Sequence, residues 1–203
     1  MVKSTPSTKT SPLSADAIVN AAIALAARES WARVRMIHVA VYFDVPLAPI
    51  HDQFHDMDAI ADAWFVRASQ TLAANQKRGF AQMPAKDRLF EVIMRWLNAL
   101  AAERQVSVQM IRQKLYPSHP QHWMPMVFSL SRLVHLILDA ALIDSTGLKR
   151  QTEELGVTML VLAILRVWAV DDTPGQERTQ AVLARRLEHG DCLMARIFAL
   201  PPN

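Results

Sequence analysis

The sequence predicts an all-α protein, and three observations carry that prediction. Apolar residues recur at the three-to-four-residue spacing of an amphipathic helix through most of the 203 residues, and no segment alternates as a β-strand does. Apolar residues make up 51% of the chain and charged residues 20%, with only 5 glycines, which is typical of a helix-rich globular protein. Short breaks rich in Pro, Gly, Asp, Ser and Thr separate the periodic segments, so we expect nine helices.

Three short helices are expected in the N-terminal part of the chain. The first begins after Ser14, a good cap residue, and runs to about residue 29. Two shorter helices follow at about 35–43 and 46–53, and Pro46 suits the first position of a helix. Their inner positions are apolar, as in a helix-turn-helix whose second helix projects outward.

Six longer helices are expected in the rest of the chain. The last of them is marked by Thr173 as its cap and Pro174 at its first position. Asp171-Asp172, just before, is interpreted as a helix-end and capping pair rather than as a catalytic pair of carboxylates. The six helices are expected at about 57–79, 85–103, 106–116, 124–143, 148–171 and 175–199.

Composition also indicates where the protein acts. A single cysteine, Cys192, excludes an internal disulfide and is typical of a reducing compartment. The N-terminus lacks the apolar run of a secretory signal. The longest apolar run, 157–170, contains Arg166 and is too short to span a bilayer. We therefore expect a cytoplasmic protein.

The excess positive charge lies away from the predicted helix-turn-helix. The whole chain carries a net charge of +3. Residues 1–66 hold five basic and seven acidic residues, a net charge of −2, so the remaining residues carry +5. Composition alone therefore does not favour DNA binding by the N-terminal part.

Residues 34–65 nevertheless resemble the DNA-binding end of TetR-family regulators, where the motif I-A-x-x-A-G-V-S-x-x-x-L-Y-x-x-F-x-x-K-E-x-L recurs. The interior positions of that motif are matched by Val39-Ala40, Val45, Ile50 and Phe54. The resemblance implies a TetR-like fold with a three-helix head and a six-helix C-terminal bundle. The implied divisions are a flexible basic arm at 1–13, a helix-turn-helix head at 14–56, and a ligand-binding and dimerisation domain at 57–203.

Four positions depart from the motif. Asp44 replaces the turn glycine and can adopt the left-handed conformation at modest cost. Pro46 replaces the serine that starts the second helix, and His51 replaces the phosphate-contacting tyrosine. Met57, between two aspartates, replaces a lysine, which removes phosphate neutralisation.

The resemblance implies DNA-binding residues among the nearby cations and along the second helix of the motif. These candidates are Arg33, Arg35, Pro46, Ala48, His51 and Gln53.

A hydrophobic ligand pocket and a homodimer are expected in the C-terminal part. Methionine and flat aromatic side chains line adaptable apolar pockets. The last two helices carry broad apolar faces, including Leu155, Met159 and Leu162, and a second copy of the chain is the natural cover for them. The candidate ligand-binding residues are Trp96, Met110, Trp123, Met126, Val127, Leu130, Val134, Met159 and Leu162.

Two functions remain open on these grounds. Residues 87–100 and 165–187 are also similar to the TetR-shaped lipid-binding family that assists ubiquinone biosynthesis. The protein is then either a ligand-responsive regulator that binds DNA as a dimer, or a carrier of an isoprenoid or other lipid that binds no DNA. A degenerate head that binds another protein is a third possibility. Fold cannot separate these jobs.

No catalytic motif is present, so no enzyme activity and no cofactor are predicted. His119 and His122 have a spacing that could suit a metal, but no cysteine or carboxylate ligand lies near them in the sequence. We interpret them as part of a surface loop or a pocket rim, and no metal site is predicted.

Overall fold

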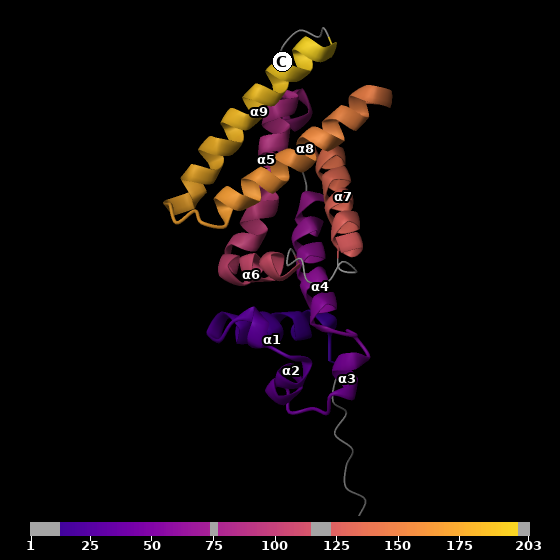
Figure 1. The fold of residues 1–203 in the computed structure, drawn as a ribbon, viewed down its shortest axis with the longest axis vertical. Helices are drawn as coiled ribbons and strands as arrows, with labels where there is room; N and C mark the ends of the chain where they lie inside the picture. Colours follow the sequence, from indigo (N-terminus) through magenta and orange to yellow (C-terminus); the bar gives the residue numbers. More distant parts are fainter. Residues whose placement is uncertain (1–12, 74–76, 115–122, 199–203) are drawn as a thin grey trace, which may run out of the picture. The chain divides into compact units, whose positions relative to one another are not determined.

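Helices account for all the regular structure in the described part of the chain, as the sequence predicts (Figure 1). The computed structural model describes residues 13–73, 77–114 and 123–198, and the side chains of residues 123–128 lie outside that description. Contacts divide the chain into two units, Met1–Trp64 and Phe65–Asn203. The all-α prediction is confirmed.

The first unit is built on helix α1 (Ala15–Arg28), which packs against α2 (Met36–Tyr42). The Ser14 hydroxyl accepts a hydrogen bond from the Ala17 N–H at 3.2 Å, which confirms the predicted cap. Helix α1 buries one apolar face, and α2 and the short α3 (Ala48–His51) complete the core. The buried core side chains include Ile18, Ala22, Trp31, Val39, Ala40, Ile50 and Phe54.

The turn between α2 and α3 needs a left-handed residue, and Asp44 provides it with a φ of 54°. The Val45 N–H then donates to the Ala40 carbonyl at 3.1 Å, which closes the end of α2. Aspartate tolerates this region better than most residues, because its short polar side chain bonds locally. The expectation for Asp44 is confirmed.

Helix α3 is shorter than the predicted range of 46–53. Leu47 is its cap residue and Pro49 lies in its first turn, so Pro46 belongs to the preceding turn rather than to the helix. The Ile50 N–H donates to the Leu47 carbonyl at 3.1 Å. A proline restricts the residue before it to extended geometry, which holds Val45 outside a helix.

Helix α4 (Met57–Gln70) is also shorter than predicted and is followed by the 3₁₀ turn η2 (Thr71–Ala73). The Ser69 hydroxyl donates to the Phe65 carbonyl at 2.9 Å, and the Thr71 hydroxyl donates to the Ala68 carbonyl at 2.7 Å. Of these two, the Thr71 hydroxyl binds a carbonyl of the last turn, and such a bond competes with continuation of the helix. The predicted helix 57–79 therefore ends at Gln70.

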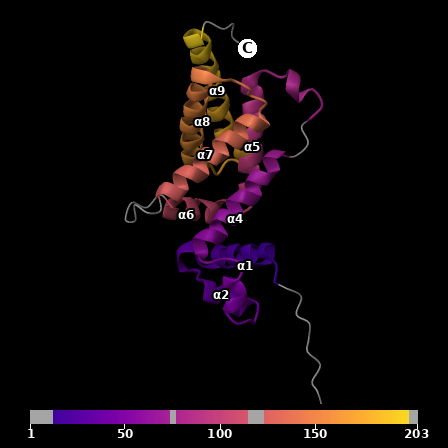
Figure 2. The same ribbon diagram turned by 90° about the vertical axis from the view of Figure 1, so that its right-hand side faces the viewer.

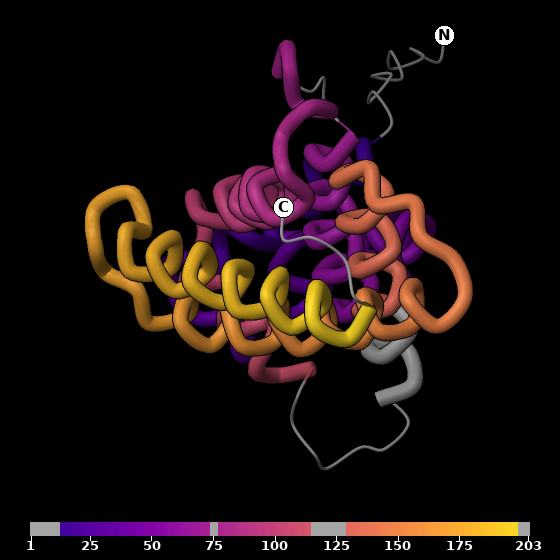
Figure 3. Tube along the Cα trace, turned by 90° about the horizontal axis from the view of Figure 1, so that it is seen from above, coloured from indigo at the N-terminus to yellow at the C-terminus, as the bar shows by residue number. Residues whose placement is uncertain are grey.

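In the second unit, helices from distant parts of the chain pack together (Figure 2). Helix α5 (Ala85–Ala101) follows the 3₁₀ turn η3 (Phe80–Gln82) and packs against α6 (Arg104–Lys114), α7 (Trp123–Ala140) and α9 (Glu177–Phe198). Helix α8 (Gly147–Trp168) packs against α7 and α9. Figure 3 shows α8 in orange and α9 in yellow, lying side by side.

A polar network connects α8 to α9. The 3₁₀ turn η5 (Pro174–Gln176) precedes α9, and Gly175 and Gln176 both have positive φ, so α9 begins at Glu177 rather than at residue 175. The Asp171 carboxylate accepts the Thr179 N–H at 2.8 Å, inside the first turn of α9. The capping interpretation of Asp171 is confirmed.

No helix in the described ranges is long and apolar enough to cross a membrane.

Candidate functional site

All six predicted DNA-binding residues are exposed on the first unit. Arg33 ends the 3₁₀ turn η1 (Trp31–Arg33), and Arg35 is the residue before α2. The other four, Pro46, Ala48, His51 and Gln53, lie in or beside α3. Ile50 and Phe54, four residues apart, are both buried, so their packing turns the polar positions of this segment outward.

The first unit is rich in acidic residues, and at least one of them has a structural role. Residues 13–64 hold three arginines and seven carboxylates. Asp56 caps α4, because its Oδ1 accepts the Ala59 N–H at 2.7 Å. Its Oδ2 also lies 3.2 Å from His55 Nε2. The carboxylate beside Met57 therefore has a role in starting α4 that sequence comparison with the motif does not reveal.

The predicted ligand-binding residues do not gather around one cavity. Trp96, Met110 and Val134 are buried, while Leu130 and Leu162 are partly exposed. Met159 is 61% exposed and lies on the outer side of α8. Trp123, Met126 and Val127 belong to α7, but their side chains lie outside the described residues.

Trp96 has one notable polar feature. Its indole Nε1 is buried and has no hydrogen-bond partner among the described residues. An indole N–H can only donate, and a buried donor without an acceptor costs about 1–3 kcal/mol. The position is therefore suited to an acceptor supplied from outside the described residues.

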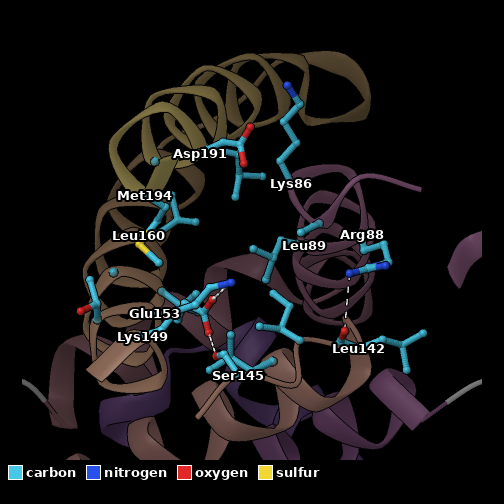
Figure 4. Close-up of a pocket in the computed structure, with 18 of the residues that line it drawn as sticks. Lys86, Arg88, Leu89, Leu142, Ser145, Lys149, Glu153, Leu160, Asp191 and Met194 are labelled. Carbon is cyan, nitrogen blue, oxygen red and sulfur yellow. Dashed lines mark hydrogen bonds and ion pairs between the residues drawn. The ribbon is translucent and has the colours of Figure 1, made fainter. Parts of the chain in front are cut away.

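A cavity of about 370 Å³ opens elsewhere in the second unit, between α5, the end of α7, α8 and α9 (Figure 4). None of the predicted ligand-binding residues with described side chains lines it. Its lining combines leucine and methionine side chains with four cations and three carboxylates. The charged lining residues are Lys86, Arg88, Asp144, Lys149, Glu153, Arg186 and Asp191.

Two glycines in the middle of helices, Gly156 and Gly190, also line this cavity. Glycine in a helix interior is unfavourable, so its presence indicates a packing or functional role. A search for hydrophobic periodicity does not detect this signal.

The buried network around Asp171 perturbs the pKa of that carboxylate. Burial by itself raises the pKa, but hydrogen bonds from the side chains and backbone N–H groups of Thr173 and Thr179 outweigh it, and they lower the pKa from 3.8 to about 2. Asp171 is 1% exposed, and Arg104 of α6 donates to its backbone carbonyl. The Asp171 carboxylate therefore has a structural role at the start of α9.

In the described ranges, no group of three or more His, Cys, Asp and Glu side chains could hold a metal ion. His119 and His122 lie outside those ranges.

Solved structures of transcriptional regulators are similar to this chain. The "TetR transcriptional regulator from Nitrosomonas europaea ATCC 19718" shares 34% sequence identity and a TM-score of 0.74, over 85% of this chain and 95% of that chain. A "TetR transcriptional regulator from Rhodococcus sp. RHA1" has 19% identity and a TM-score of 0.64, over 85% and 92% of the two chains, a likeness of fold alone. No protein-family profile and no curated protein matches the sequence.

Proposed function

Because the chain belongs to the TetR family of transcriptional regulators, we propose that it binds DNA as a homodimer and responds to a hydrophobic small molecule. The observation that carries the proposal is the geometry of the first unit. The turn at Asp44 closes α2, the side chains of Ile50 and Phe54 are buried, and the side chains around α3 remain free to meet bases.

The cations proposed to contact DNA phosphates are Arg33 and Arg35, both exposed and both beside the start of α2. The arm at 1–13, which adds Lys3 and Lys9, lies almost wholly outside the described residues and remains a proposed contact. Phosphate contacts supply most of the sequence-independent affinity for DNA. Because such contacts release counterions, we expect sequence-specific DNA binding that weakens as the salt concentration rises.

The homodimer is supported by apolar side chains that the second unit leaves exposed on α8 and α9. Leu155 of α8 is 65% exposed, and Met159, one turn later, is similarly open. On α9, Leu193 and Ile197 are exposed one turn apart. Exposed apolar groups at helical spacing on two neighbouring helices fit an isologous interface between two copies.

The small-molecule part of the proposal is supported by the cavity beside α5. A volume near 370 Å³ lies at the lower end of the range of about 300–1,000 Å³ for small-molecule sites. We propose a regulatory rather than a catalytic role for such a molecule.

The decisive experiment is selection of bound fragments from the source genome by the purified protein at near-physiological salt. A regulator enriches a short palindromic site, because two related heads read two half-sites. Failure to enrich any site, with DNA retained only at very low salt, contradicts the proposal. The acidic residues of the first unit then favour the second candidate, a lipid carrier that keeps the fold without binding DNA.

A substitution in the proposed DNA surface tests where the contacts lie. We expect Gln53→Ala to weaken binding to the selected site about tenfold, as loss of one base contact costs about 1–3 kcal/mol. The matched control is Gln82→Ala, which removes an exposed glutamine from the second unit. Unchanged affinity and unchanged sequence preference in Gln53→Ala contradict the placement of the recognition segment.

A further inference from the structure

The cavity beside α5 contains an unusual pairing of glycines from two helices. Gly156 lies in the middle of α8 and Gly190 in the middle of α9, and both line the cavity. Glycine in a helix interior costs about 0.5–1 kcal/mol relative to alanine. Neither glycine has a positive φ, and a Cβ added to either meets no atom within 4 Å.

Backbone geometry and close packing therefore do not explain these two glycines. Both glycines are exposed and both line the cavity, so a Cβ at either position would stand in open space. Two unfavourable residues on separate helices therefore leave the same cavity less obstructed than alanine or a larger residue would.

The walls of the cavity are largely apolar. Figure 4 shows Leu89 of α5 on one side and Leu160 and Met194, from α8 and α9, on the other. Leu138 of α7 and Leu187 of α9 also line it. Such walls suit an aliphatic body, and methionine adapts to irregular shapes.

One end of the cavity carries cations that are not fully neutralised. Arg88 binds only backbone carbonyls, with Nη1 donating to Ala81 at 3.0 Å and Nη2 to Leu142 at 3.5 Å. Its Nε is buried with no hydrogen-bond partner among the described residues. A partly buried guanidinium that contacts carbonyls alone keeps its full charge, and it therefore favours an added anion.

Lys149 lies at the same end, and Figure 4 shows its side chain entering the cavity. Its Nζ is 4.0 Å from Glu153 Oε1, beyond hydrogen-bond distance, while the other oxygen of Glu153 accepts the Ser145 hydroxyl. The carboxylate of Glu153 is thus partly satisfied by Ser145, and the ammonium of Lys149 retains donors for a ligand.

The other charged lining residues are Asp144, which precedes Ser145, and Lys86, Arg186 and Asp191. Lys86 is 3.4 Å from Glu188, and Figure 4 shows Asp191 of α9 near Lys86. The lining as a whole holds four cations and three carboxylates, an excess of one positive charge. Arg88 contributes to this excess with a buried Nε that has no partner among the described residues.

We propose that this cavity binds an aliphatic carboxylate, with its chain between Leu89, Leu160 and Met194 and its carboxylate at Arg88 and Lys149. The inference rests on the small-molecule part of the proposed function and names its chemical class. It does not depend on DNA binding.

The test is calorimetric titration of the full-length protein with three probes of equal chain length: decanoate, decan-1-ol and decylamine, each below its micellar concentration. Decanoate is expected to bind about tenfold or more tightly than decylamine, because charge-assisted hydrogen bonds favour the acid and the cations repel the amine. Equal binding of decanoate and decylamine, or no binding of decanoate, overturns the proposal. Because the titration contains no DNA, either failure is distinct from failure of the genomic selection.

Two variants locate the site. Gly156→Leu places a good helix former with a large side chain at a position that lines the cavity, so the protein should remain folded or become more stable while decanoate binding weakens. Ala184→Leu, at an exposed position of α9 outside the cavity lining, is the matched control and should bind decanoate normally. Unchanged binding by a folded Gly156→Leu variant overturns the assignment.

Lys149→Met separates charge from packing. It keeps most of the aliphatic stem and removes the ammonium, so decanoate affinity should fall about tenfold while decan-1-ol affinity stays the same. An equal loss for both probes contradicts a role for Lys149 in binding the carboxylate.

Discussion

At the scale of single residues, Asp171 has the most consequential environment in the described chain. Its two carboxylate oxygens accept the backbone N–H and the hydroxyl of both Thr173 and Thr179. The two bonds to Thr179 join the segment after α8 to the first turn of α9. A buried acid without them would be neutral or costly, so the hydrogen bonds explain why a carboxylate is tolerated there.

The lowered pKa of Asp171 has a measurable consequence for stability. Because the folded-state pKa of about 2 lies below the ordinary value of 3.8, the stabilisation is complete above about pH 4 and is lost as the pH falls toward 2. Asp171→Asn should therefore lower the free energy of unfolding by about 2 kcal/mol at pH 7. Urea unfolding at pH 7 and pH 2.5 measures the difference, which should shrink at the lower pH.

The neighbouring exposed carboxylate provides the control. Asp172→Asn changes the same charge without touching the network and should leave stability within about 0.5 kcal/mol at both pH values. A deficit for Asp171→Asn that is equal at both pH values contradicts the linkage.

At the scale of elements, the sequence predicts some helix ends correctly and others wrongly. Ser14 and Asp171 act as caps through local hydrogen bonds, so residue type and spacing suffice to identify them. The periodicity predicts that α4 continues to residue 79, but the helix ends at Gln70, where the Thr71 hydroxyl binds the Ala68 carbonyl of the last turn. A hydroxyl can point to solvent or to the backbone, and periodicity does not distinguish the two.

Asp56 offers a test at this scale. Asp56→Ala should lower the free energy of unfolding by about 1 kcal/mol, because the Ala59 N–H loses its acceptor at the start of α4. Asp56→Ser retains a capping oxygen and should recover most of that loss. Thermal or urea unfolding of the three proteins measures the effect.

Asp52→Ala is the control for a change of charge in the same unit, since Asp52 is exposed and follows the C-terminal end of α3. A carboxylate is unfavourable beside a helix C-terminus, so this variant should not lose stability. If Asp56→Ser is as unstable as Asp56→Ala, the carboxylate acts through its charge and not as a cap.

At the scale of the whole molecule, the second unit leaves α8 with two different apolar sides. Val157 and Leu160 line the cavity, whereas Leu155 and Met159 are exposed. The cavity and the proposed dimer interface therefore use separate faces of one helix. This arrangement explains how a single, nearly continuous apolar segment can serve two roles.

Leu155→Glu tests the proposed interface. A charge without a partner in a buried apolar contact costs about 3–5 kcal/mol, so the dimer should weaken at least about a hundredfold. Sedimentation equilibrium measures the dissociation constant. Val66→Glu, at an exposed apolar position of α4, is the matched control and should leave association unchanged. A dimer that withstands Leu155→Glu contradicts an interface centred on this part of α8.

Much of the fold and part of the candidate site follow from the sequence. Helix order, the buried positions Val39, Ile50 and Phe54, and the left-handed turn at Asp44 all depend on interactions within a few residues, so local pattern is enough to predict them. The exposure of all six proposed DNA-binding residues follows from the same periodicity, while their contact with DNA remains a prediction.

The sequence by itself determined the helices, the family motif and the polar surface around α3, because each arises from short-range spacing. Only the tertiary structure decided where the cavity lies, because Leu89, Gly156 and Gly190 come together from distant parts of the chain. It also decided that Met159 faces outward. A helix that is apolar on nearly all sides carries no periodic signal for its inner face, so the neighbouring helices select it.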